Sequence, residues 1–83
     1  MTTYTITVSK PRPSMMWDEV EIEVDNYQDA VSFAHGVWLV AGRRTSVVKG
    51  LYHWHTVDYR GIATDRNHNS GVPEKQLLTP LNA

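Results

Sequence analysis

The stretch EVEIEVDNYQDAVSFAHGVWLVAG, residues 19–42, decides the fold, because its apolar residues change from the spacing of a strand to that of a helix. Apolar and acidic side chains alternate over residues 19–24, which predicts a half-buried strand whose glutamates face solvent. Asp25 or Asn26 can then cap a helix, and apolar residues recur at helical spacing over about residues 27–41. A strand that leads directly into an amphipathic helix predicts a mixed α+β domain.

A second strand is predicted upstream of this stretch. Over residues 2–9, apolar side chains alternate with hydroxyl side chains, again the period of a half-buried strand. The following segment KPRPSMMWD, residues 10–18, contains two prolines, which lack amide donors and disfavour sheet pairing. The two strands are therefore expected to form a hairpin with a long connecting loop.

Further strands are predicted after the helix. Residues 45–49 and 51–59 are rich in β-branched and aromatic side chains, and Gly50 between them permits a turn or a bulge. We expect two strands there, and residues 61–65 could add a short fifth one. Residues 66–83 are poorly patterned and predict turns followed by a tail that lies against the domain.

These elements predict a single α+β domain over residues 1–83, with the order β-β-α-β-β and one amphipathic helix packed on an antiparallel sheet. A domain of 83 residues leaves little room for a large enzyme pocket. The end of the helix, Val37–Ala41, is apolar nearly all round, which favours cover by a second chain. A homodimer is therefore one expectation.

The composition is that of an ordinary globular protein, with 41% hydrophobic and 20% charged residues. The chain contains no cysteine, which excludes disulfides, cysteine-based zinc sites and a thiol nucleophile. Its N-terminus lacks a signal-peptide pattern, and no apolar run approaches the roughly 18 residues that suggest a membrane span. We expect a cytoplasmic protein without membrane contact.

Acidic residues are unevenly distributed along the chain. Six of the nine lie between residues 18 and 29, with no Lys or Arg among them, although the formal net charge is only -1. Three of these six, Glu19, Glu21 and Glu23, share one side of the predicted strand. They could simply discourage edge-to-edge aggregation, or they could form an acidic stripe that docks on a basic partner, such as a nucleic-acid-binding protein whose ligand they imitate.

The sequence His53-Trp54-His55 suggests metal chemistry, because residues i and i+2 of a strand point to the same side. The pattern is similar to the paired strand histidines of cupins and carbonic anhydrases, but both families need a larger fold, and the downstream Glu of cupins is an Asp here. Two ligands are too few, so His53 and His55 are only weak metal candidates and no cofactor is predicted. Candidates for a third ligand are Asp58, Asp65, His68 and His35.

A nucleic-acid interface could combine basic residues with stacking aromatics on the sheet. Tyr52 and Trp54 could stack on the bases of a single strand. No RNP or GXXG motif is present, and the acidic strand would repel phosphates. The basic residues that could contact phosphates are Lys10, Arg12, Arg43, Arg44, Lys49 and Arg60.

Three large apolar residues, Met15, Met16 and Trp17, stand in the proline-flanked loop. They could fold back and close one end of the core. If they are exposed, they have the composition of a protein-binding hot spot. The sequence leaves both alternatives open.

No nucleophile elbow, H-E-x-x-H pair or P-loop is present, so we expect a non-enzymatic module that binds another protein as an inhibitor or adaptor. In size and general build the chain resembles small phage-encoded inhibitors, including anti-CRISPR proteins, although it shares no motif with them. That resemblance implies a protein partner. A nucleic-acid-binding module is the alternative, and a metal-dependent enzyme that uses His53 and His55 comes third. The partner-binding candidates are Met15, Met16, Trp17, Glu19, Glu21, Glu23, Tyr52 and Trp54.

Overall fold

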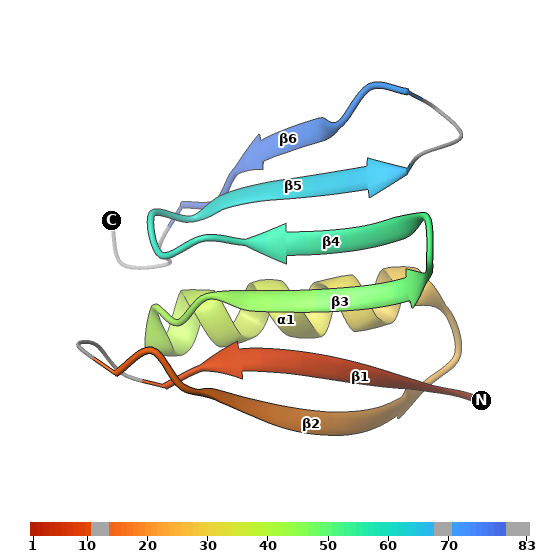
Figure 1. The fold of residues 1–83 in the computed structure, drawn as a ribbon, viewed down its shortest axis with the longest axis horizontal. Coiled ribbons are helices and arrows are strands. Elements are labelled where there is room, and N and C mark those ends of the chain that lie inside the picture. The colour runs from red at the N-terminus through yellow and green to blue at the C-terminus, as the bar shows by residue number, and fades with distance from the viewer. Residues whose placement is uncertain (11–13, 68–70, 80–83) are drawn as a thin grey trace.

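The structure is a computed structural model, and it describes residues 1–10, 14–67 and 71–79. These residues form one helix and a six-stranded antiparallel sheet of order β2-β1-β3-β4-β5-β6 (Figure 1). The elements are β1 (Thr2–Ser9), β2 (Trp17–Val24), α1 (Tyr27–Ala41), β3 (Thr45–Gly50), β4 (His53–Val57), β5 (Ile62–Asn67) and β6 (Glu74–Leu77).

The predicted α+β class and the helix are confirmed, but the number of strands is wrong. The sheet has six strands, and β6 lies in the stretch that was predicted to be a poorly patterned tail. All four residues of β6 are exposed, because it is an edge strand that pairs with β5 through its backbone. Such a strand needs no alternation of apolar and polar residues, so the sequence carries no sign of it.

Strand boundaries also differ from the predictions. β2 already begins at Trp17, because its pairing with β1 continues without a break to Ser9. β4 is shorter than the predicted residues 51–59, since Leu51 and Tyr52 form the turn after β3. β5 replaces the short fifth strand predicted over residues 61–65 and runs from Ile62 to Asn67.

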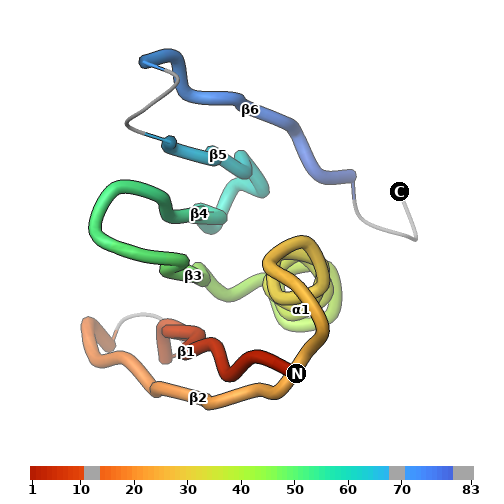
Figure 2. The backbone as a smooth tube through the Cα atoms, turned by 90° about the vertical axis from the view of Figure 1, so that its right-hand side faces the viewer, coloured from red at the N-terminus to blue at the C-terminus, as the bar shows by residue number. Residues whose placement is uncertain are grey.

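The helix lies inside the curve of the sheet. The six strands form an arc around α1, so that one sheet face contacts the helix and the other is free of it (Figure 2). The side chain of Asn26 caps the helix by accepting a hydrogen bond from the Asp29 amide at 2.9 Å. Gly42 ends it in a left-handed conformation with φ of 66°. No helix among the described residues is both long and apolar enough to cross a membrane.

The core consists of two apolar clusters along α1. The first, Ile6, Val8, Ala30, Ala34 and Val47, joins the helix to β1 and β3. The second lies at the end of the helix and includes Leu78, whose amide donates to the Gly61 carbonyl at 2.8 Å, so Leu78, directly after β6, packs against the domain. Its members are Trp38, Val57, Ala63 and Leu78.

Candidate functional site

Most partner-binding candidates lie on the sheet face that α1 leaves free, which we call the open face. Ile6 and Val8 face the helix, so Thr7 and its cross-strand partner Glu19 face away from it. The same alternation puts Trp54 on the open face, paired with Val48 and Arg66 on the neighbouring strands. Other residues that the register places there are Trp17, Glu21 and Glu23.

The loop between β1 and β2 presents apolar side chains to solvent. Met15, Met16 and Trp17 are 86%, 64% and 47% exposed, so the described part of the loop does not close the core. The guanidinium of Arg44 lies 4.8 Å from the centre of the Trp17 ring. We call Met15, Met16 and Trp17 together the β1–β2 tip.

The acidic and aromatic candidates differ in their exposure and surroundings. Glu19, Glu21 and Glu23 are exposed along the edge strand β2 and form the acidic stripe. Tyr52 is exposed in the turn after β3. Half-buried Trp54 lines a hollow of about 300 Å³ together with Arg66, Asn67, Gly71 and Pro73.

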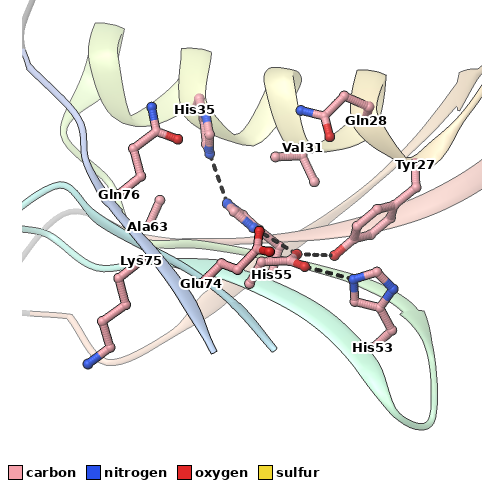
Figure 3. A pocket seen from close by; sticks show the side chains of 11 residues that line it. Tyr27, Gln28, Val31, His35, His53, His55, Ala63, Glu74, Lys75 and Gln76 are labelled. Carbon is pink, nitrogen blue, oxygen red and sulfur yellow. Dashed lines mark hydrogen bonds and ion pairs between the residues drawn. The ribbon is translucent and has the colours of Figure 1, made fainter. Parts of the chain in front are cut away.

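A second group of functional side chains meets on the opposite face, between α1 and β4–β6. A polar pocket of about 290 Å³ opens there (Figure 3). His53 and His55 both point to this side, as their spacing predicted. The pocket is lined by Tyr27, Gln28, Val31, His35, His53, His55, Ala63, Asp65, Glu74, Lys75 and Gln76.

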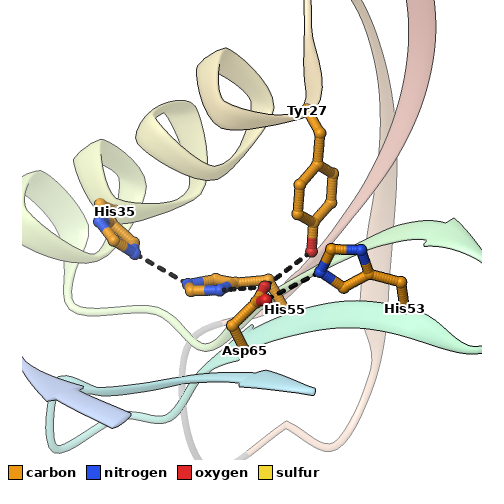
Figure 4. Close-up of polar contacts among 5 residues, drawn as sticks. All are labelled: Tyr27, His35, His53, His55 and Asp65. Carbon is orange, nitrogen blue, oxygen red and sulfur yellow. Dashed lines mark hydrogen bonds and ion pairs between the residues drawn. The ribbon is translucent and has the colours of Figure 1, made fainter. Parts of the chain in front are cut away.

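Asp65 is the centre of a hydrogen-bond network in this pocket (Figure 4). Its Oδ1 accepts from the Tyr27 hydroxyl at 3.0 Å and pairs with Nδ1 of His55 at 3.1 Å. Its Oδ2 pairs with Nε2 of His53 at 2.8 Å. On its other side, His55 Nε2 lies 2.8 Å from Nε2 of His35, which extends from the helix. His55 is only 6% exposed.

The charge of Asp65 fixes the hydrogen positions around it. Burial alone would raise the pKa of Asp65, but the hydrogen bonds from His53, His55 and Tyr27 outweigh it and hold the pKa below its ordinary value. Burial and the neighbouring carboxylate raise the pKa of Tyr27, so its hydroxyl keeps its proton. An ionised carboxylate only accepts, so His55 donates from Nδ1. Neutral His55 then offers a lone pair at Nε2, and His35 donates to it.

This geometry bears on the metal hypothesis. Nε2 of His53 and Nδ1 of His55 are each hydrogen-bonded to an oxygen of the Asp65 carboxylate. Within residues 1–10, 14–67 and 71–79, no three His, Asp or Glu side chains are arranged to hold a metal. Asp58 accepts hydrogen bonds from two amides of its own turn, and His68 lies outside the described residues.

The sequence named Asp65 and His35 among four candidates to join His53 and His55, but it did not indicate Tyr27. Tyr27 and His35 lie on the helical stripe that also carries the buried Val31 and Trp38, so their inward orientation could have been inferred. Which strand residues they meet depends on the order of the strands. That order places Asp65 directly beside His55.

No family model, curated protein or solved structure matches this chain.

Proposed function

We propose that the protein is a non-enzymatic module that binds another protein through the β1–β2 tip and the open face. The observation that carries this proposal is the exposure of Met15, Met16 and Trp17 beside the acidic stripe. Trp and Met contribute large apolar contact areas to interfaces, and Arg44 beside Trp17 adds a third residue type enriched at binding hot spots.

The acidic stripe supports a partner with a basic surface. Three carboxylates on one side of an exposed edge strand create a local negative potential, which accelerates association with a positively charged surface and weakens at high salt. The tip then supplies apolar contacts that salt does not screen. The proposal extends to an inhibitor or adaptor role, for which the small size and the open sheet face are suitable.

The nucleic-acid alternative has less support. The Lys49 ammonium lies over the Tyr27 ring, 5.5 Å from its centre, on the helix side of the sheet. Lys10 pairs with Asp18 at 3.7 Å. These cations therefore do not form one basic band with Trp54, and the acidic stripe borders the same face.

Affinity capture from the native host tests the proposal. The tagged protein should recover one stoichiometric protein partner, and less of it at high salt. Trp17→Ala should reduce recovery about tenfold or more, since exposed Trp residues at hot spots contribute about 2 kcal/mol or more. Phe33→Ala is the matched control, because Phe33 is exposed to a similar degree but lies on the helix.

The results separate the alternatives. Equal losses with Trp17→Ala and Phe33→Ala would contradict binding through the tip. Recovery of nucleic acid alone would favour the second candidate. Capture of only the untagged form of this same chain would favour the homodimer that the apolar end of the helix suggests.

A further inference from the structure

We infer that the hydrogen bond between His35 and His55 is a proton-operated latch, which holds α1 to β4 at the pocket between α1 and β4–β6 and releases when both imidazoles are protonated. This goes beyond protein binding by the open face, because it concerns the other side of the sheet. It also gives the network a role that a merely structural cluster would not have.

The bond tolerates one added proton but not two. At 2.8 Å the two Nε2 atoms have room for a single hydrogen between them. When both rings are neutral, His35 donates that hydrogen. When the pair carries one extra proton, one ring is an imidazolium and still donates to the lone pair of the other. When both rings are cationic, two N–H groups and two positive charges face each other, and the bond is lost.

The surroundings of His35 oppose its protonation. Its Nε2 faces Nε2 of His55, and Nδ1 of His55 pairs in turn with Asp65 on β5. Burial, followed by the charge of His55, lowers the pKa of His35. His35 therefore takes up its proton at a pH below the ordinary histidine range.

Other titratable and charged groups around His35 and His55 also influence the protonation of their imidazoles. On β6, Glu74 favours protonation and Lys75 opposes it. Tyr27 on α1 is uncharged, and Lys49 on β3 is held over its ring. His53 on β4 pairs with the other oxygen of the same Asp65 carboxylate.

The latch lies outside the two apolar clusters that join the helix to the sheet. One cluster joins α1 to β1 and β3, and the other joins Trp38 to β4 and β5 at the end of the helix. The side-chain hydrogen bonds from α1 to β4 and β5 in the pocket come from Tyr27 and His35. Loss of the His35–His55 bond thus loosens this part of β4 from α1, while the Tyr27–Asp65 bond and both clusters keep the rest of the fold in place.

Hydrogen exchange between pH 7.5 and 4.5 tests the latch on the free protein, without a binding partner. In the wild type, the protection of β4 and β5 amides, corrected for intrinsic exchange, should fall about tenfold or more as His35 titrates. His35→Gln replaces the ring with an amide that can still donate to His55 but cannot become charged. Protection in this variant should change less than about twofold over the same range.

The matched control is His53→Gln, which removes the other histidine on Asp65 and should retain the wild-type response. The same response in His35→Gln and wild type would overturn the proposal. If His35→Gln does not fold, the NMR signals of the His35 and His55 rings in the wild type provide the test instead. Protonation of both rings without loss of amide protection would equally overturn the proposal. Since no partner is involved, failure here leaves the proposed function untouched.

Discussion

Asp65 is partly buried, with its side chain 26% exposed, and it links three donors from two different elements. Its two oxygens accept from Tyr27, His53 and His55, and nothing but an ionised carboxylate can accept at every one of these positions. Buried groups that lose their partner destabilise the folded state more than a typical hydrogen bond stabilises it. The network therefore depends on the negative charge of the Asp65 side chain.

Asp65→Asn should lower the free energy of unfolding by about 1–3 kcal/mol, because an amide offers one acceptor oxygen and turns an NH₂ group toward a donor. Urea denaturation at neutral pH measures this change. Asp29→Asn, an exposed position in the first helical turn, is the control and should cost less than about 1 kcal/mol. Equal effects of the two substitutions would show that the network contributes no stability.

Gly61 is the residue at which backbone and packing constraints coincide. Its φ is +86°, and a Cβ there would lie 2.6 Å from atoms of the Trp38 ring. Gly61→Ala should destabilise by about 2–4 kcal/mol, the sum of backbone strain and overpacking. Gly42 also has a positive φ, of +66°, but a Cβ there would meet nothing within 4 Å, so Gly42→Ala should cost only about 1 kcal/mol. Thermal unfolding of both variants checks the difference, and equal losses would refute the role of Trp38.

At the scale of elements, the pH response belongs to the junction of α1 with the sheet. The pKa of His35 is lowered in the fold, so the unfolded chain binds more protons at mildly acidic pH. The stability that is linked to neutral His35 is fully present above about pH 6.5 and is lost as the pH falls through the lowered pKa of His35. The pKa values of Asp65 and Asp58 are also lowered, and their contributions to stability persist until the pH falls below about 4.

Urea denaturation at a series of pH values should therefore show two separate losses of unfolding free energy. The loss in the mildly acidic range should disappear in His35→Gln, whereas the loss below about pH 4 should remain. A variant curve that parallels the wild type over the whole range would show that His35 is not linked to folding.

How far each element could be predicted follows from how it is stabilised. β1, β2 and α1 bury one side each, and burial leaves a period in the sequence that predicted them closely. β6 is held by backbone hydrogen bonds, and its exposed side chains leave no such period in the sequence. The candidate site divides in the same way. The shared direction of His53 and His55 followed from strand geometry, but their meeting with Asp65 and His35 required the order of the strands and the position of the helix.

For the whole molecule, the curvature of the sheet separates two candidate sites. The helix occupies the concave side of the sheet (Figure 2). The histidine network lies on that side, and the register places the acidic stripe and Trp54 on the opposite side. Exposed residues outside the core can usually be changed with little effect on folding. Trp17→Ala should therefore alter the free energy of unfolding by less than about 1 kcal/mol, so that a loss of binding can be attributed to the interface.

Hydrogen exchange of the complex with its captured partner tests the binding surface most directly. The account predicts that the partner slows exchange at the described amides of the β1–β2 tip, β2 and the turn after β3, and leaves the exposed side of α1 unchanged. Slowed exchange confined to α1, with the tip and β2 unaffected, would contradict it.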